Sequence, residues 1–242
     1  ALALGSTRAI KRALRKTDAP HHALLQQATT LVCDCDGVLY VGGTTPTDGA
    51  PQAHNKLRAA GKRFVFVTNS ALASRASLAR KLTKLGFAGV TPADCVTSAS
   101  AAAQYLRKRH PHVATAYVVG QEGLLEELEL AGIRPVGAAD TGGIADLKAN
   151  GLCDEVDAVV VGAQLEGLSY ARLAKAGAYA RRRSRPFVAT NCDANWPAGL
   201  GELVAGGGSM VEFVSYAADR RPDVDVGKPS ADLARLVQEE YS

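Results

Sequence analysis

The chain has 242 residues, of which 47% are hydrophobic and 21% are charged. This composition indicates a globular protein with one large domain or two modest ones, and it argues against a disordered chain. The net charge is only +4 and the basic residues have no aromatic residues interleaved with them, so nucleic-acid binding is not expected, and no apolar stretch is long enough to span a membrane.

The N-terminal segment is strongly basic. Before the first acidic residue it contains Arg8, Lys11, Arg12, Arg15 and Lys16. Organelle transit peptides have this bias, and a basic amphipathic helix that rests on the domain would have it too. We therefore assign residues 1–24 to an N-terminal basic extension and leave both interpretations open.

A short apolar run, Leu31–Cys33, ends in Asp34 and Asp36, and Gly37 then lets the chain turn. The pattern predicts a strand whose carboxyl end carries chemistry, because open parallel sheets bind ligands beyond those ends. Both carboxylates would face one small space, where like charges are costly unless a cation such as Mg²⁺ neutralises them. A solvated acidic turn would give the same pattern, so this motif alone leaves both interpretations open.

Strands and helices alternate along the rest of the chain. Helices are expected at 50–60, 74–85, 99–109, 122–130 and 169–183, and strands at 63–70, 96–98, 116–120, 157–162 and 186–190. This alternation predicts the α/β class with a doubly wound parallel sheet. The strand–glycine–helix turns at Gly120 and Gly162 lack the three-glycine spacing of a dinucleotide site.

Two later stretches accompany the acidic pair. The 63–70 strand ends in Thr68, Asn69 and Ser70, and Lys228 lies far along the chain in a Gly-Lys-Pro segment. The ordered set of Asp-x-Asp-Gly, strand-Thr-Asn and a distant Gly-Lys-Pro resembles the haloacid dehalogenase superfamily of aspartate-nucleophile phosphatases. The order and spacing carry this resemblance, because an isolated Thr-Asn or Gly-Lys pair would indicate nothing.

The resemblance implies a Rossmann-like core with an inserted α/β cap over the active site. The core would comprise residues 25–103 and 205–242, and the cap residues 104–204, with Gly206–Gly208 as the return hinge. Related capped phosphatases pair through the cap, which implies a homodimer. The family continues after Lys228 to a Gly-Asp-x-x-x-x-Asp segment with a further Mg²⁺ ligand, whereas this sequence ends at Ser242. We expect a truncated sequence, because a core sheet without its closing strand would expose an apolar edge.

Three stretches, 117–132, 189–193 and 205–211, resemble more narrowly the 2-phosphoglycolate phosphatases of plants and algae. This resemblance implies Mg²⁺-dependent hydrolysis of 2-phosphoglycolate, a reaction of photorespiration, in the chloroplast stroma, with the cytoplasm as the alternative compartment. A more distant resemblance to pyridoxal phosphate phosphatases leaves that compound or another small phosphomonoester as an alternative substrate. A non-catalytic paralogue is the third hypothesis. Ser70, residues 162–164 and the loop 194–197 depart from the family pattern.

The resemblance also assigns roles to individual residues. Asp34 would attack phosphorus and form an aspartyl phosphate, and Asp36 would protonate the departing alkoxide and then deprotonate the attacking water. Lys228 would add a fixed positive charge, and both acids would hold Mg²⁺. The residues expected to bind the phosphate and the rest of the substrate are Thr68, Asn69, Ser70, Asn191, Asp193 and Trp196.

Overall fold

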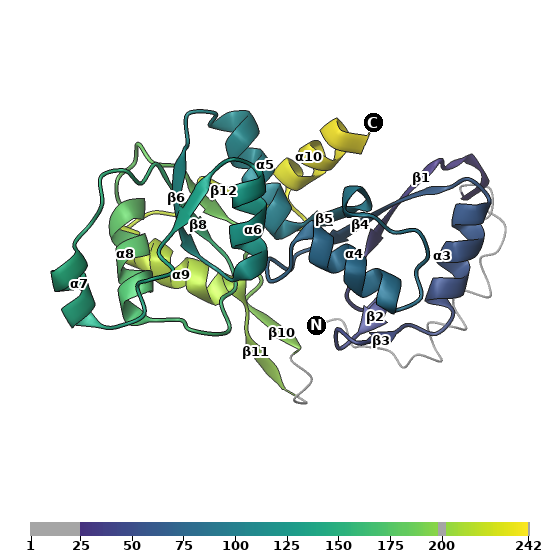
Figure 1. The fold of residues 1–242 in the computed structure, drawn as a ribbon, viewed down its shortest axis with the longest axis horizontal. Helices are drawn as coiled ribbons and strands as arrows, with labels where there is room; N and C mark the ends of the chain where they lie inside the picture. The colour runs from purple at the N-terminus through teal and green to yellow at the C-terminus, as the bar shows by residue number, and fades with distance from the viewer. Residues whose placement is uncertain (1–24, 198–201, 242) are drawn as a thin grey trace.

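The computed structural model describes residues 25–197 and 202–241, so the predicted N-terminal extension lies outside the described residues. The molecule is elongated, and two α/β lobes lie side by side along its long axis (Figure 1). Each lobe is built around a parallel sheet, with three strands in one and five in the other. None of the described helices has the length and apolar character needed to cross a membrane.

The first lobe contains the sheet that carries the acidic pair. Its strands lie in the order β1 (Thr30–Asp34), β4 (Arg63–Thr68) and β5 (Cys95–Thr97). Its other elements are the helices α3 (Ala50–Ala59) and α4 (Arg75–Lys84), the 3-10 turn η1 (Pro92–Asp94) and the hairpin of β2 (Tyr40–Val41) and β3 (Thr45–Pro46). The register places Asp34 opposite Val67 and Thr68 opposite Thr97, so the carboxyl ends of these strands meet at one edge.

The second lobe is built on the five-stranded sheet. Its strands lie in the order β12 (Val224–Asp225), β9 (Phe187–Ala189), β8 (Ala158–Val161), β6 (Thr115–Val119) and β7 (Arg134–Val136). Its helices are α6 (Glu122–Leu130), α7 (Ile144–Asn150), α8 (Tyr170–Ala180) and α9 (Gly207–Ala218). The antiparallel hairpin of β10 (Asn195–Pro197) and β11 (Leu203–Ala205) projects away from this sheet (Figure 1).

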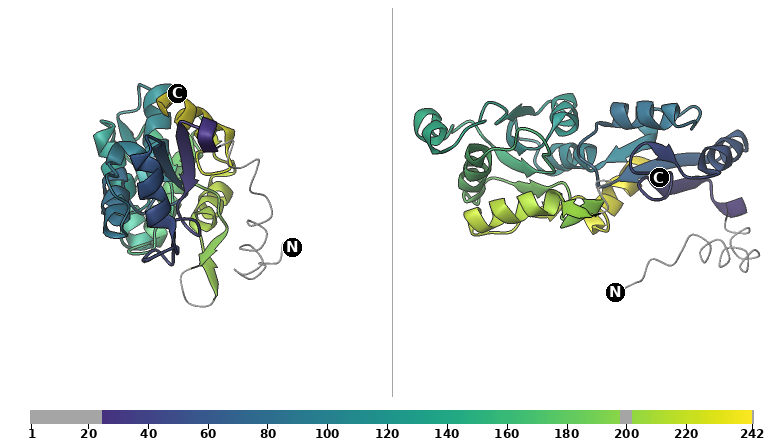
Figure 2. Two further views of the ribbon diagram at one scale, coloured as in Figure 1. Left: turned by 90° about the vertical axis from the view of Figure 1, so that its right-hand side faces the viewer. Right: turned by 90° about the horizontal axis from the view of Figure 1, so that it is seen from below.

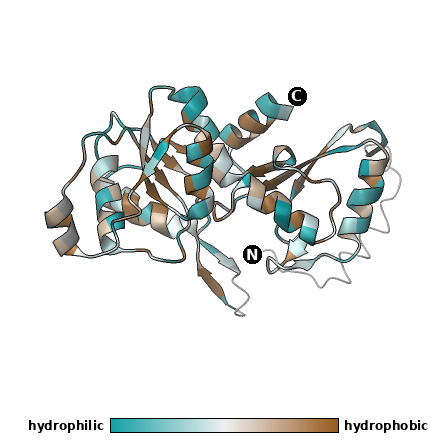
Figure 3. Cartoon of the chain, in the orientation of Figure 1, coloured by the Kyte–Doolittle hydropathy of each residue, from teal (hydrophilic) through white to brown (hydrophobic). Residues whose placement is uncertain are grey.

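Helices cover both faces of the second sheet. Val118, Val160 and Val188 point to the face covered by α6 and by α5 (Ser98–Arg109), whereas Val159 and Val161 point to the face covered by α8 and α9. Strands buried on both faces read as continuous apolar runs, which is why these segments are rich in valine. The strands of this sheet are mostly brown, the colour of hydrophobic residues, in Figure 3. The view from below shows α9 along one side of this lobe (Figure 2). The predicted doubly wound α/β class is therefore confirmed.

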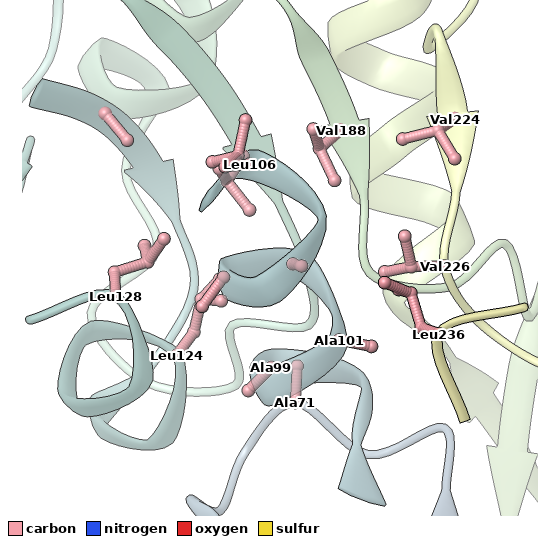
Figure 4. Packing of buried hydrophobic residues seen from close by; sticks show 14 of the residues in the cluster. Ala71, Ala99, Ala101, Leu106, Leu124, Leu128, Val188, Val224, Val226 and Leu236 are labelled. Atoms are coloured by element: carbon pink, nitrogen blue, oxygen red, sulfur yellow. The ribbon is translucent and has the colours of Figure 1, made fainter. Parts of the chain in front are cut away.

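One hydrophobic cluster joins the two lobes. Val65 and Val67 of β4 belong to the same cluster as Leu124 of α6, Val188 of β9 and Val226, which follows β12. The alanine-rich helix α5 runs through this cluster, and its small side chains allow close packing (Figure 4). Helix α10 (Ala231–Tyr241) adds Leu233 and Leu236 to it. The relative position of the two sheets is therefore set by a shared core.

The segments 40–41, 45–46, 92–94, 134–136, 144–150, 195–197, 203–205, 207–218 and 224–225 form elements that the sequence patterns did not predict. The last of these segments lies beyond residue 205, where the sequence predicts the end of the cap and the return to the core. That boundary stays a prediction. Val224 and Asp225 pair with Val188 and Ala189 of β9, so the second sheet takes a strand from beyond that boundary.

The glycine run expected to act as a hinge begins helix α9. Gly206 is the N-cap residue, and Gly207 and Gly208 lie in the first turn. A Cβ atom on Gly206 would lie 2.3 Å from the Asp193 carbonyl oxygen, and one on Gly208 would lie 2.6 Å from the Cys192 carbonyl oxygen. The backbones therefore approach so closely that only glycine fits.

Candidate active site

The acidic pair sits where β1 ends. Asp34 is the last residue of the strand, and its Oδ1 accepts a hydrogen bond from the Cys35 backbone N–H at 2.8 Å. Gly37 then adopts a positive φ of 80°, and its N–H donates to the Tyr40 carbonyl at 2.8 Å, which closes a tight turn. The turn leaves the side chains of Asp34 and Asp36 exposed at the edge of the sheet.

Tyr40, which the sequence did not mark as functional, holds the second acid, and Lys81 packs against Tyr40. The Tyr40 hydroxyl donates to Asp36 Oδ2 at 3.3 Å, and the Lys81 ammonium lies over the Tyr40 ring, 3.6 Å from its centroid. Burial raises the pKa of Tyr40, and the neighbouring Cys35 and Asp36 raise it further, so the phenol stays protonated and donates. The sequence signal for Tyr40 is its position four residues after Asp36 in the same turn.

Lys228 reaches the nucleophile candidate from the second lobe. Its Nζ forms an ion pair with Asp34 Oδ1 and also donates to the Val67 carbonyl at 3.3 Å. The side chains of Lys228 and Asp34 are 33% and 44% exposed, so a small ligand can approach both. The pair therefore joins a fixed cation to a carboxylate at an accessible position.

Asn69 fixes the backbone on which Lys228 stands. Its Oδ1 accepts from the Lys228 backbone N–H at 2.6 Å, and its Nδ2 donates to the Lys228 carbonyl at 3.1 Å. The same Nδ2 donates to Asp193 Oδ2 at 3.0 Å. One amide side chain thus connects the loop after β4 with two loops of the second lobe.

The Asn69 carbonyl is a second point of attachment. It accepts from Asn191 Nδ2 at 2.8 Å and from Ser98 Oγ at 2.6 Å, while Asn191 Oδ1 accepts from the Asp193 N–H at 3.1 Å. Ser98, at the start of α5 directly after β5, was not predicted as a site residue. The rule that ligand sites lie beyond the carboxyl ends of parallel strands could have indicated it.

The remaining predicted residues divide into two groups. Thr68 Oγ1 accepts from the Ser70 N–H at 3.1 Å, and Ser70 Oγ accepts from the Leu72 N–H at 3.3 Å, so these hydroxyls shape the loop beside Asp34. Trp196 lies on β10 opposite Val204. Within the described part of the chain, no hydrogen bond joins its side chain to the other predicted residues. Hydrogen bonds and an ion pair therefore link Asp34, Lys228, Asn69, Asn191 and Asp193, and Thr68 and Ser70 flank Asn69 in the same loop, whereas Asp36 is placed only by its position two residues after Asp34.

Cysteine side chains near the site are neutral thiols. Burial and the nearby carboxylates of Asp36 and Asp34 raise the pKa of Cys35 far above its usual range. Burial, together with Asp225, raises the pKa of Cys192 to about 12. Because the nucleophilic form of cysteine is the thiolate, Asp34 is the better candidate for a nucleophile here.

Comparison with known proteins identifies the family of the chain. The family model of the haloacid dehalogenase-like hydrolases matches residues 31–134. Glycerol-3-phosphate phosphatase from Mus musculus is 40% identical over 228 residues, which cover 90% of this chain and 70% of that protein. Phosphoglycolate phosphatase 2 from Arabidopsis thaliana is 34% identical over 233 residues, which cover 90% of this chain and 74% of that protein.

A solved structure gives the same result. The glycerol phosphate phosphatase from Mycobacterium tuberculosis, crystallised in complex with magnesium, has a TM-score of 0.72 and 33% sequence identity to this chain. The match covers 89% of this chain and 59% of that one. Sequence and fold agree over most of the chain, which therefore belongs to the haloacid dehalogenase-like hydrolases, among the phosphatases of that family.

Proposed function

We propose that the protein hydrolyses a short phosphate monoester through an aspartyl-phosphate intermediate. The observation that carries this proposal is the contact between the Lys228 ammonium and the Asp34 carboxylate at the end of β1. An Asp34 oxygen would form a bond to phosphorus as the bond from phosphorus to the departing alkoxide breaks. Lys228 would stabilise the charge on the transferring phosphoryl group.

Asp36 would act as the acid and then as the base. It would give a proton to the departing alkoxide and later take one from the water that cleaves the aspartyl phosphate. A placed acid/base of this kind contributes roughly 10²–10⁴-fold in rate. The hydrogen bond from the Tyr40 hydroxyl supports this role, because it holds the Asp36 carboxyl group in one orientation.

The loop after β4 would hold the phosphate oxygens. Thr68 ends the strand that pairs with β1, and Ser70 follows in the loop, so the hydroxyls and backbone amides of this loop are the proposed donors to the phosphate. Asn69, Asn191 and Asp193 bind one another and the Lys228 backbone. These bonds favour a role in fixing the shape of the site over direct contact with phosphate.

Asp34 and Asp36 would hold Mg²⁺. Among the described residues, no group of three or more His, Cys, Asp or Glu side chains converges as a metal site. Mg²⁺ at phosphate-transfer sites is usually held by one or two carboxylates, with water and substrate phosphate as the other ligands, and the pair of exposed carboxylates fits that pattern. When bound, the ion would reduce the repulsion between the nucleophile and the phosphate dianion.

Two short phosphate monoesters are the main candidate substrates. The resemblance of residues 117–132, 189–193 and 205–211 favours 2-phosphoglycolate, whereas the 40% identity to a glycerol-3-phosphate phosphatase favours glycerol 3-phosphate. Both have a small, oxygen-rich body. Pyridoxal phosphate, which carries an aromatic ring, is the third compound for comparison. Trp196, on the projecting β10–β11 hairpin, is proposed to contact the part of the substrate that is not phosphate.

Phosphate release by the wild type and by Asp34→Asn, measured with Mg²⁺ on all three compounds, tests the proposal. We expect the wild type to turn over at least one short ester, EDTA to abolish the activity, and Asp34→Asn to lose roughly 10³-fold or more in kcat. Asp154→Asn is the matched control, because that side chain is 91% exposed. Equal rates for wild type and Asp34→Asn would remove the nucleophile, and a wild type inactive on every ester would favour a non-catalytic paralogue.

A further inference from the structure

We propose that Glu127, on helix α6 of the second lobe, is a positioning residue for the phosphate-binding loop of the first lobe. This loop, residues 69–74, runs from the end of β4 to the start of α4. The inference rests on the phosphatase reaction proposed above. It adds a residue that touches neither the nucleophile nor its partners but fixes the far end of the loop.

Glu127 caps helix α4 from the opposite lobe. Its Oε1 accepts from the Arg75 backbone N–H at 2.6 Å, and its two oxygens accept from Arg75 Nε at 3.2 and 3.0 Å. Arg75 is the first residue of α4, where backbone N–H groups have no partner within the helix and a negative charge is favourable. The Glu127 side chain is only 1% exposed, so its carboxylate is shielded from solvent in the folded chain.

Gly123 brings the same helix against the loop backbone. It lies one turn before Glu127, and a Cβ atom at this position would lie 2.4 Å from the Ala73 carbonyl carbon and 2.5 Å from the Ala73 Cα. These distances are shorter than any real contact, so α6 rests directly on the loop. Leu124, the next residue of α6, and Ala71 of the loop belong to the shared hydrophobic cluster (Figure 4).

The loop is therefore held at both ends. At one end Asn69 binds the Lys228 backbone and accepts from Ser98, and at the other end Glu127 binds Arg75. Loss of the Glu127 contacts would release the second end while leaving Asp34 and Lys228 chemically unchanged. A displacement of about 1 Å in a group that orients substrate can cost roughly 100-fold in rate, so such a release has a measurable effect.

The experiment compares Glu127→Gln and Glu127→Ala in the full chain, with p-nitrophenyl phosphate as substrate and inorganic phosphate as inhibitor. We expect Glu127→Ala to lower kcat/KM roughly ten- to 100-fold and to raise the inhibition constant of phosphate, at a temperature where circular dichroism shows a folded chain. Glu127→Gln keeps an oxygen that accepts from the Arg75 N–H, and it should recover part of the loss. Glu129→Ala, on the exposed side of α6, is the matched control.

A purely structural role would lower the melting temperature and leave the kinetics of the folded variants unchanged. That result for Glu127→Ala would overturn the inference. If Glu127→Ala does not fold, wild-type kinetics in folded Glu127→Gln and Gly123→Ala would overturn it in the same way. A wild type without any turnover would instead overturn the proposed function, and this inference with it, so the two failures are distinct.

Discussion

The Lys228 ammonium lies against the Asp34 carboxylate although 194 positions separate the two residues in the sequence. Asp34 ends β1 of the three-stranded sheet, whereas Lys228 follows β12 of the five-stranded sheet. The Asn69 side chain binds the Lys228 backbone twice: it accepts from the Lys228 N–H and donates to the Lys228 carbonyl. The proposed catalytic pair therefore exists only while the two lobes keep their relative position.

Lys228→Met should remove most of the activity and little of the stability. We expect kcat to fall roughly 10²–10³-fold, because a fixed positive charge beside the transferring phosphoryl group is lost. The free energy of unfolding should change by about 1 kcal/mol or less, since both partners are partly exposed and solvent screens the pair. Steady-state kinetics and urea unfolding measure the two effects. Lys84→Met, at an exposed position of α4, is the control, and a Lys228→Met variant with wild-type kcat would contradict the proposed role.

Gly227→Ala should displace Lys228 without changing its chemistry. A Cβ atom at position 227 would lie 2.6 Å from the Asn191 Cβ and 2.8 Å from the Asn191 Cα. Crowding of this kind costs about 1–3 kcal/mol, and here the loop that carries Lys228 must move to relieve it. We expect a loss of stability in urea unfolding together with a fall in kcat.

Gly143→Ala provides the control for that substitution. Its Cβ would meet no atom within 4 Å, although Gly143 is the N-cap residue of α7. We expect its kinetics to match the wild type, with a loss of at most about 1 kcal/mol in the free energy of unfolding from the poorer N-cap. If both glycine variants behaved alike, the effect at position 227 would not be steric.

The α/β class and the strand ends that carry Asp34 and Thr68 could be predicted because their patterns are local. An apolar run that ends in polar residues shows both a strand and its carboxyl end. The pairing of Asp34 with Lys228 is not local, and only the resemblance in motif order indicated it. Strand β12 has two residues, Val224 and Asp225, which is too short for any periodicity to show.

The sequence also did not predict three single polar residues that shape the site. Glu127 accepts three hydrogen bonds from Arg75, 52 positions away, and nothing in its sequence neighbourhood indicates that contact. Tyr40 and Ser98 carry only weak positional signals, Tyr40 in the turn after the acidic pair and Ser98 directly after a strand end. The run Gly206–Gly208 did mark an unusual backbone, but composition cannot distinguish a hinge from a close contact. The distances to the loop at 191–193 show the contact.

A buried ion pair in the second lobe should be essential to stability. Lys175 Nζ lies 2.6 Å from Asp140 Oδ1, with exposed side-chain fractions of 6% and 11%. Asp140 Oδ2 accepts from the Tyr117 hydroxyl at 2.7 Å, and burial, with the hydrogen bond to Asp140, raises the pKa of Tyr117, so the phenol stays protonated. Lys175→Met would leave a buried carboxylate without its cation, and the free energy of unfolding should fall by about 3–5 kcal/mol.

A double variant tests whether the loss of stability comes from an unpaired buried charge. Asp140→Asn combined with Lys175→Met removes both charges, and we expect it to be more stable than Lys175→Met alone in urea unfolding at neutral pH. Lys148→Met, at an exposed position of α7, is the control. A Lys175→Met variant within about 1 kcal/mol of the wild type would contradict this interpretation of the pair.

His54 should make the first lobe sensitive to mild acid. Its ring packs among Phe64, Phe66 and Phe87, with ring centroids 4.5, 5.5 and 5.4 Å away. Asn55 Oδ1 accepts from the Ala88 N–H and lies 2.9 Å from His54 Nδ1, so Nδ1 is the donor. His54 Nε2 is buried and has no hydrogen-bond partner among the described residues. Burial therefore lowers the pKa of His54 from 6.5, and the ring is neutral in the folded chain.

The sign of the pH effect follows from this shift. Below the unfolded pKa of 6.5, the unfolded chain binds a proton that the folded chain excludes, so the free energy of unfolding falls as the pH drops toward the lower, folded pKa. Above pH 6.5 this contribution is constant. We expect a slope of at most about 1.4 kcal/mol per pH unit from this one group in urea unfolding. His54→Leu should reduce the slope and the exposed control His112→Gln should not, whereas equal slopes for His54→Leu and the wild type would show that another group sets the acid sensitivity.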